Sequence, residues 1–369
     1  MTGNILKVIS PGPISTIQDL GRSGYQRFGV SVSGAADRYA LRLGNLLVGN
    51  DQRGAAIEVT LGGAEFEFST RTTFAITGAD LSPSLNGAPI PMWQTVEADT
   101  GDRLSLSAPA SADAGLRTYV NVSGSIDTPS VLGSRSTHIG ARLGGIDGGA
   151  LKVDDEIPLG PVTNPVQAGR RVPGHLLPHY SGEITARVVP GPQDDYFDAN
   201  AIETFYTSSY TVTDKSDRMG CRLDGPEVRA VDDAHDIISD GVVTGAIQIP
   251  GDAKPIVLLA DRQTTGGYAK IGVIASVDLA LVAQAAPGAR IHFESITADE
   301  AAHLARQRMA SLRDMTFEEA PPVIENQYLY EVRIDGYDYQ VDLTSGARQG
   351  QSTAVVNGIE YAIEVDPGE

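Results

Sequence analysis

Cysteine and long apolar runs are scarce in this sequence of 369 residues. Its single cysteine, Cys221, cannot form a disulfide within the chain, so the sequence does not indicate an oxidising compartment. No window approaches the roughly 18 apolar residues that span a membrane, and the apolar part of MTGNILKVIS is too short for a signal peptide. We therefore expect a soluble, cytoplasmic protein. Cys221 is more typical of a small buried side chain than of a reactive thiol.

Basic residues are also few, since 28 Lys and Arg stand against 47 Asp and Glu and the formal net charge is −19. Nucleic acids and anionic membranes require clusters of Lys and Arg, and the sequence has none. Both are therefore excluded as expected partners.

Common catalytic and metal-binding motifs are missing as well. There is no GxSxG, no HExxH and no loop with the GxxxxGK[ST] spacing that holds nucleotide phosphates. The six histidines lack metal-ligand spacing: His175 and His179 are four residues apart, but Pro178 lies between them and disfavours a shared helical face. We expect no metal site.

Turn-forming residues are abundant instead, with 41 Gly and 21 Pro spread along the chain. This composition predicts many short strands and a mainly β fold with a few helices, of the α+β class. Strands alternating with turns between residues 56 and 160 are typical of a closed barrel or a sandwich. The Asn86–Gly87 pair predicts a two-residue hairpin turn.

Three helices are indicated by apolar spacing and end signals. The first follows Ser33, which we expect to cap it, places Tyr39, Leu43, Leu46 and Leu47 on one face, and ends near Gly49. The others are expected over QDDYFDANAIETFYT and near residues 276–286. A fourth is predicted to begin at the Thr297 and Glu300 capping box and to reach about Arg313.

Four regions are expected along the chain: a first subdomain at 1–165, a Pro-rich connection at 166–184, a second subdomain at 185–315, and a linker with a β-hairpin extension at 316–369. The extension contains two pairs of strands, each joined by a DG or NG turn. Four short strands alone would be marginally stable.

Five runs interleave Asp, Arg, Ser, Thr and Gly, and we expect them to converge on a polar cleft. They are STIQDLGR (15–22), GSRSTH (133–138), SDRMGCRL (216–223), SDGVVTGAIQ (239–248) and ADRQTTGGY (260–268). In such a cleft Arg can clamp a carboxylate or developing oxyanion, Asp can accept a proton, and Gln with Ser or Thr can bind an amide or ureido edge. The interleaved residues fit polar, planar small molecules without a metal.

Several longer motifs closely resemble the biotin-dependent carboxyltransferase family, which includes the C-type subunit of 5-oxoprolinase (the Kip-type antagonist), allophanate hydrolase subunit 2 and the second half of the carboxyltransferase domain of urea carboxylase. The resemblance covers about residues 5–300. The motifs that carry it are PGPISTIQDLGRSGYQRFGVSVSGAAD, IEVTLGG, GSRSTH, GGALKVDDEIPLG, VVPGPQDDYF, SDRMGCRL, SDGVVTGAIQIPGDAKPIVLLADRQTTGGYAKIG and PGARIHF.

The resemblance implies two domains related to the cyclophilin-like β-barrel and an active cleft shared with a B-type, Kip-inhibitor-like subunit. It implies a heteromeric enzyme that acts on an amide, lactam or urea-like substrate, either as a carboxyltransferase or as an ATP-dependent 5-oxoprolinase complex. The isolated chain is expected to be inactive. A biotin carboxyl carrier and an A-type subunit are further implied partners.

The chemistry of each residue type indicates its expected role in that cleft. Carboxyl transfer needs donors for the negative charge that develops on the biotin ureido oxygen and a base for the accepting nitrogen. We assign the first role to Arg262 with the N–H groups of Gly266 and Gly267, and the second to Asp261. The other candidate substrate-binding residues are Gln263, Thr264, Thr265, Tyr268, Arg135, Ser136, Asp217, Arg218, Gln248, Gln18 and Asp19.

The chain has no AMKM-like biotin attachment site and no recognisable nucleotide loop. Carboxybiotin is therefore expected from a separate carrier domain, ATP is expected only through other subunits, and no metal is expected. The extension after residue 316 is interpreted either as a docking element for a carrier or as a stabilising flap.

Two alternatives to the enzyme subunit stay open. A regulatory antagonist would bind a kinase-inhibitor-type partner without catalysis. A free-standing hydrolase is disfavoured by the missing nucleophile motif.

Overall fold

The computed structural model describes residues 4–319, apart from residue 112, and four strands at 327–334, 337–345, 351–356 and 359–364. The chain divides into two compact units, Met1–Glu318 and Glu319–Glu369. The first unit contains two sheets in its N-terminal half and a closed barrel in its C-terminal half.

The N-terminal half is built from a six-stranded and a five-stranded sheet. The six-stranded sheet has the order β11 (Glu156–Pro158), β1 (Ile5–Pro11), β4 (Ala64–Phe68), β9 (Arg103–Leu106), β6 (Pro83–Leu85), β7 (Ala88–Pro89). The five-stranded sheet has the order β2 (Ile14–Gln18), β3 (Ala56–Thr60), β10 (Arg117–Val122), β5 (Thr72–Gly78), β8 (Thr95–Ala98).

Alternating polarity explains the strands of this half. In β4 the side chains of Ala64, Phe66 and Phe68 are buried, while Glu65 and Glu67 between them are half-buried, because successive side chains of a strand point to opposite faces. The β6–β7 hairpin turns at Asn86 and Gly87, whose φ angles of 51° and 83° are those of the expected two-residue turn.

Helix α1 (Arg38–Leu47) packs on the N-terminal half. Leu43 and Leu47 are buried in one cluster with the partly buried Tyr39 and Leu46, which confirms the expected face. The expected cap is wrong: Asp37, not Ser33, accepts hydrogen bonds from the backbone N–H groups of the first turn.

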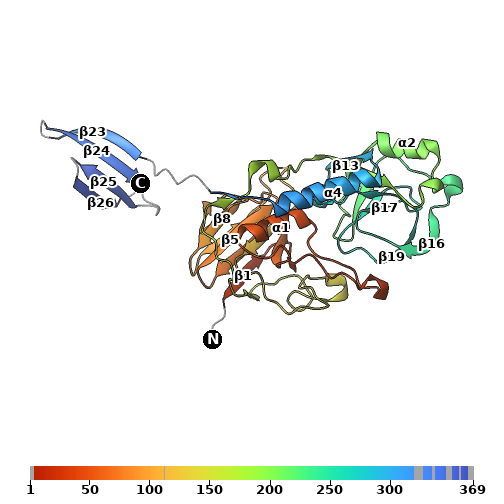
Figure 1. Ribbon diagram of the computed structural model, residues 1–369, viewed down its shortest axis with the longest axis horizontal. Coiled ribbons are helices and arrows are strands. Elements are labelled where there is room, and N and C mark those ends of the chain that lie inside the picture. Colours follow the sequence, from red (N-terminus) through yellow and green to blue (C-terminus); the bar gives the residue numbers. More distant parts are fainter. Residues whose placement is uncertain are drawn as a thin grey trace. The chain divides into compact units, whose positions relative to one another are not determined.

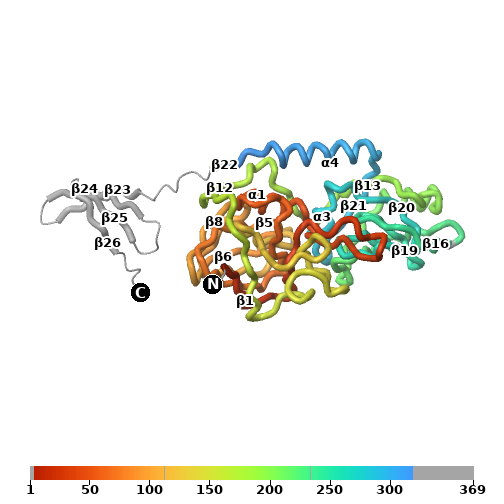
Figure 2. The backbone as a smooth tube through the Cα atoms, turned by 60° about the horizontal axis from the view of Figure 1, so that its bottom comes forward, coloured from red at the N-terminus to blue at the C-terminus, as the bar shows by residue number. Residues whose placement is uncertain are grey.

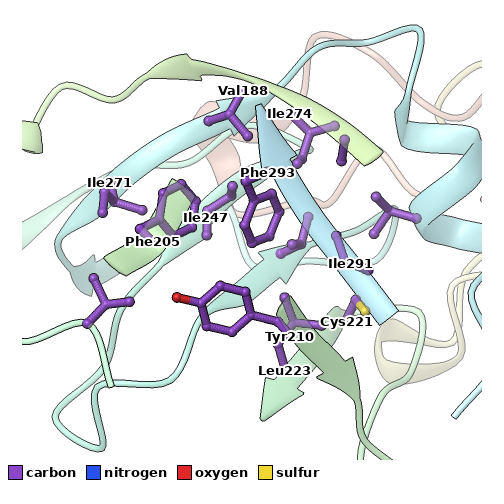
Figure 3. Packing of buried hydrophobic residues seen from close by; sticks show 14 of the residues in the cluster. Val188, Phe205, Tyr210, Cys221, Leu223, Ile247, Ile271, Ile274, Ile291 and Phe293 are labelled. Carbon is purple, nitrogen blue, oxygen red and sulfur yellow. The ribbon is translucent and has the colours of Figure 1, made fainter. Parts of the chain in front are cut away.

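The C-terminal half is a closed barrel with the order β13 (Glu183–Pro190), β20 (Lys270–Ile274), β17 (Ala246–Gln248), β18 (Ile256–Leu258), β15 (Gly220–Asp224), β14 (Ser209–Val212), β21 (Arg290–Ser295). Its interior is filled by aliphatic and aromatic side chains, among them Phe205, Tyr210, Ile247, Ile271 and Phe293 (Figure 3). Cys221 lies in this core and is 2% exposed, as expected of a small buried side chain. The expected mainly β class is therefore confirmed.

Two further strands, β16 (Asp236–Gly241) and β19 (Thr265–Tyr268), pair with each other outside the barrel. The helices of this half are α2 (Ala199–Thr207), α3 (Leu279–Gln284) and α4 (Ala298–Arg313). The Thr297 and Glu300 capping box at the start of α4 is confirmed. Helix α4 runs along both halves of the first unit in both views (Figures 1 and 2).

Helices α2 and α3 are shorter than expected. The segment QDDYFDANAIETFYT is divided between the 3₁₀ turn η4 (Asp194–Tyr196) and α2, and α3 does not begin until Leu279. The other short elements are η1 (Gln26–Phe28), η2 (Ile139–Ala141), η3 (Gly174–Leu176), η5 (Val231–Asp233), β12 (Arg170–Arg171) and β22 (Glu318–Glu319).

The second unit contains one antiparallel sheet in the order β23 (Gln327–Ile334), β24 (Tyr337–Ser345), β25 (Gln351–Val356), β26 (Ile359–Glu364). The expected DG and NG turns at residues 335–336 and 357–358 lie outside the described residues.

Candidate functional site

An ion pair between Asp261 and Arg218 lies at the junction of the two halves. Asp261 follows β18, and its Oδ2 accepts a hydrogen bond of 2.7 Å from Arg218 Nε, while Oδ1 accepts one of 3.1 Å from Nη2. The two side chains are 10% and 11% exposed. This is the bidentate geometry that makes an arginine and carboxylate pair strong.

The N-terminal half contributes a second carboxylate, Glu58 of β3, to the same arginine. Glu58 Oε1 pairs with Arg218 Nη1, and its Oε2 accepts hydrogen bonds from Tyr119 Oη at 2.7 Å and from the backbone N–H of Ala36 at 2.9 Å. Glu58 is 1% exposed. Arg218 thus connects the barrel to the sheets through two buried carboxylates, and we name Glu58, Arg218 and Asp261 the junction triad.

Burial and charge have opposite effects on the pKa values of Asp261 and Arg218. Burial alone would raise the pKa of Asp261, but the Arg218 charge and the hydrogen bonds from Arg218 and Ser33 outweigh it and hold that pKa below its ordinary value. Burial would lower the pKa of Arg218, but Glu58 and Asp261 raise it above its ordinary value. Asp261 is therefore ionised and paired, and a carboxylate with a lowered pKa is a weaker base than a free one; its expected role as base stays a prediction.

Asp19, in the N-terminal half, is hydrogen-bonded to the loop that contains residues 134–136. Its Oδ1 accepts hydrogen bonds from Ser134 Oγ and Ser136 Oγ, and its Oδ2 accepts one of 2.6 Å from the backbone N–H of Arg135. The Arg135 side chain bonds to Thr128 and to Asp127. Runs 15–22 and 133–138 are thus together in space, with Asp19 as the organising residue.

Ser33 links that loop to the junction triad. Its Oγ lies 2.6 Å from Asp261 Oδ1 and 3.1 Å from the carbonyl oxygen of Thr137. Gln18 Nε2 donates to the same Thr137 carbonyl at 3.1 Å. Ser33 adopts a φ of 55°, a conformation uncommon for a residue with a side chain.

Two arginines near this junction are buried without full hydrogen bonding. Arg262 is 2% exposed, and its Nε and Nη1 have no hydrogen-bond partner among the described residues; Nη2 lies 3.3 Å from the carbonyl oxygen of Val242. Arg22 is 1% exposed, with Nε and Nη1 likewise unpartnered and Nη2 bonded to the Ser136 carbonyl. Burial lowers both pKa values. Buried guanidinium groups normally have partners, so these two arginines retain donor capacity that the described residues do not use.

Strand β19 begins three residues after Arg262 and contains both Gly266 and Gly267. Residues Thr265 to Tyr268 form β19 and pair with β16, and Thr264 accepts a backbone hydrogen bond from Val242. Neither Gly266 nor Gly267 has a positive φ. A side chain at Gly266 would meet Gln248 Nε2 at 2.4 Å, so close approach to Gln248 explains that glycine.

Amide groups lie beside this strand. Gln248 is 2% exposed, and its Oε1 lies 3.3 Å from Nε2 of the exposed Gln263. Asp217 is also exposed, but its Oδ1 accepts the backbone N–H groups of Met219 and Gly220. Asp217 therefore stabilises its own turn.

Exposed apolar side chains occur in the same segments as the candidate residues. Met219 follows Arg218 and is 49% exposed, Val243 follows Val242 and is 53% exposed, and Ile238 of β16 is 96% exposed. Phe28, 66% exposed, belongs to a loop that extends toward the barrel half in both views (Figures 1 and 2).

Sequence reasoning missed three residues of the site. Glu58 could have been found, because it is a charged residue in the otherwise apolar segment AAIEVTL. Arg22 belongs to the run at residues 15–22, but it was not assigned a role. Ser33 was assigned to a helix cap, and no sequence signal connects it to Asp261.

Within the described residues, no group of three His, Cys, Asp or Glu side chains is arranged to hold a metal ion. None of the described helices is long and apolar enough to cross a membrane.

Comparison with known proteins relates these features to enzymes. The chain is 37% identical over 297 residues to the C-type subunit of the 5-oxoprolinase of Escherichia coli, and the match covers 80% of this chain and 93% of that protein. It is 33% identical over 332 residues to the urea amidolyase of Lachancea kluyveri, covering 84% of this chain but 18% of that protein.

A solved structure gives a similar result. The urea carboxylase of Kluyveromyces lactis is 28% identical and has a TM-score of 0.79, and the match covers 96% of this chain and 34% of that chain. The profile of the family described as carboxyltransferase domain, subdomain A and B, matches residues 28–295. These matches confirm the resemblance seen in the motifs: the chain belongs to the carboxyltransferase domain family, subdomain A and B.

Proposed function

We propose that this chain supplies one side of the carboxyl-transfer site of a heteromeric, biotin-dependent enzyme that acts on an amide, lactam or urea-like substrate. The other side of the cleft comes from a B-type, Kip-inhibitor-like subunit. The observation that carries the proposal is the Arg262 guanidinium, which is 2% exposed and has two nitrogen atoms without a partner in the described part of the chain. Such a group in a water-poor site binds a developing negative charge far more strongly than it would in water.

Carboxybiotin, delivered by a carrier, supplies an activated carboxyl group when bound. The unpartnered nitrogens of Arg262 and Arg22 fit its ureido and carboxylate oxygens, because both kinds of oxygen accept hydrogen bonds from guanidinium. Arg262 binds the oxygen on which negative charge develops. Asp261 acts as a positioning residue, since its carboxylate holds Arg218 and Ser33 across the junction.

The extension after residue 318 favours carboxyl transfer to a urea-like nitrogen over lactam opening. The E. coli 5-oxoprolinase match covers 93% of that protein but 80% of this chain. The K. lactis urea carboxylase match covers 96% of this chain, so it must reach beyond Glu318, where the first unit ends. The second unit therefore has a counterpart on the urea carboxylase side.

The exposed apolar residues Met219, Ile238 and Val243 support a partner beside this site. Their burial against a second protein would remove apolar surface from water, at about 25 cal/mol per Å². The same surface also fits the antagonist alternative, which needs tight binding without chemistry.

The test is reconstitution of the full chain with a biotinylated carrier and a B-type subunit. Carboxyl transfer to urea or guanidine is measured, and turnover of 5-oxoproline with ATP and an A-type subunit is measured in parallel. We expect Arg262→Gln to lower kcat/KM by about 100-fold or more, the usual loss on removing a donor to a developing oxyanion. Arg222→Gln, which removes an exposed arginine of β15, is the matched control and should be unchanged.

Wild-type turnover by Arg262→Gln would contradict the assigned role. Tight binding to the B-type subunit with no turnover of any of these substrates would favour the antagonist instead.

A further inference from the structure

A cavity of about 240 Å³ lies between three helices and the end of β18, apart from the junction triad. Its wall includes residues of α1, α3 and α4 together with Leu259 and Ala260. Asp261 and Arg218 do not line it. The chain therefore presents Leu259 and Ala260 to the cavity and the next side chain to the junction triad.

The residues that line the cavity are partly apolar and partly positively charged. Small and aliphatic side chains such as Val277, Ala280 and Leu312 form much of the wall. The charged residues of the lining are Arg38, Arg42 and Arg308, and no Asp or Glu of the described part of the chain belongs to it. In a chain of net charge −19, a cavity with three arginines and no carboxylate is an unusual local concentration of positive charge.

The three arginines differ in how they are held. Arg308 Nη1 donates to the Val277 carbonyl at 2.7 Å, and its guanidinium carbon lies 4.6 Å from the centre of the Tyr39 ring. Arg42 Nη1 donates to Gln52 Oε1 at 3.0 Å. Arg38 has no hydrogen bond or ion pair with any residue that the structure describes, and its side chain is reached by solvent. Arg38 is therefore free to bind an anion.

The position of Arg38 makes an anion favourable there. Arg38 and Arg42 are four residues apart on α1, where like charges repel. Arg38 is also the first residue of the helix, the end at which the helix dipole disfavours a cation. Desolvation by the surrounding chain and the charge of Arg42 lower the pKa of Arg38 and outweigh the opposite effects of Asp19 and Tyr119.

We propose that this cavity binds a small organic acid, with its carboxylate on Arg38 and Arg42 and its apolar body against Val277, Ala280 and Leu312. The volume is below the roughly 300–1,000 Å³ of sites for drug-sized ligands, so the acid is small, of the size of hexanoate. Carboxylates pair with guanidinium in a planar, directed geometry. The lining of the acid site does not include Arg262 or the junction triad, although the charge of Arg38 acts on Arg262.

Calorimetric titration of the full chain with hexanoate tests the proposal, with hexanamide as the neutral probe of the same shape. We expect hexanoate to bind and hexanamide to bind at least tenfold more weakly, and we expect added salt to weaken hexanoate binding. Arg38→Gln should weaken binding at least tenfold. Ala280→Leu should abolish it, because the larger side chain fills the cavity.

Arg306→Gln is the matched control, since Arg306 is exposed on α4 two residues from Arg308 and does not line the cavity. It should bind hexanoate as the wild type does. Thermal unfolding of each variant shows that it is folded. Absence of hexanoate binding to the wild type, equal binding of hexanamide, or unchanged binding by Ala280→Leu would overturn the proposal. The titration requires no turnover, so its outcome is independent of the carboxyl-transfer test.

Discussion

The carboxylate of Asp261 contacts two side chains from different halves of the protein, Arg218 of the barrel and Ser33 of the N-terminal half. Removing one member of a buried ion pair leaves the other charge uncompensated, which costs more than the pair itself contributes. The residue next to Arg218, Asp217, carries the same charge but is exposed and caps its own turn. Burial and partners therefore decide what each aspartate does.

Asp261→Asn is expected to lower the free energy of unfolding by about 3 kcal/mol at pH 7, the lower end of the range for breaking a buried pair, because Glu58 still pairs with Arg218. The lowered folded pKa of Asp261 stabilises the protein above the unfolded pKa of about 3.9. This contribution is lost as the pH falls through the folded pKa. Urea unfolding as a function of pH should show the difference between variant and wild type shrinking below about pH 4.

Asp217→Asn is the control for Asp261→Asn, and its effect should stay within about 1 kcal/mol. An equally small loss in Asp261→Asn, or a loss that does not depend on pH, would show that the junction triad is not a stabilising ion pair.

Strand β19 has an unusual composition for a strand, because two of its four residues are glycine. Thr265–Tyr268 nevertheless pairs with β16 in antiparallel register. The two glycines differ in surroundings. Gly266 lies against Gln248, whereas the nearest atoms to a side chain at Gly267 would be 3.6 Å away.

Gly266→Ala is expected to destabilise the protein by about 1–2 kcal/mol, because the new methyl group must displace the buried Gln248 amide. Gly267→Ala should be neutral or slightly stabilising, since its methyl group meets ordinary contact distances and the unfolded chain loses freedom. Chemical denaturation of both variants checks this order. The reverse order would mean that β19 and Gln248 do not approach as closely as the structure shows.

Buried polar contacts between residues that are far apart in the sequence join the two halves of the first unit. Gln284, at the end of α3, is 3% exposed and lies among groups of the N-terminal half. Its Oε1 accepts the backbone N–H groups of Leu116 and Arg117, and its Nε2 donates to Asp37 Oδ2 and to the Arg117 carbonyl. One side chain thus makes four hydrogen bonds across the junction.

Gln284→Ala should lower the free energy of unfolding by about 3 kcal/mol, because it leaves several buried groups without partners. We also expect the two halves to unfold less cooperatively. The fluorescence of Trp93, the single tryptophan, reports the N-terminal half, while circular dichroism reports both. The two urea transitions should separate in the variant and coincide in the wild type.

Gln307→Ala, at an exposed position of α4, is the control and should leave both transitions unchanged. Coincident transitions and full stability in Gln284→Ala would show that the halves are coupled by other contacts.

The sequence pattern correctly predicted those elements that are determined by residues close together in the chain. The face of α1, the Asn86–Gly87 turn and the Thr297 capping box each depend on residues within a few positions of one another. The cap of α1 was misassigned because Ser33 and Asp37 are both good capping residues by type. Choosing between them required knowing that Ser33 bonds to Asp261, 228 residues away.

The sequence by itself determined the mainly β class, the positions of most strands and membership of the carboxyltransferase family, because side-chain alternation, turn residues and motif order are properties of the linear chain. The tertiary structure decided which charges are paired and which are left over. Glu58 and Asp261 compensate Arg218, whereas Arg262 and Arg22 keep nitrogens that no described residue pairs with, and Arg38 faces a cavity. Desolvation and long-range contacts set the state of each charge, and both exist only once the two halves have packed together.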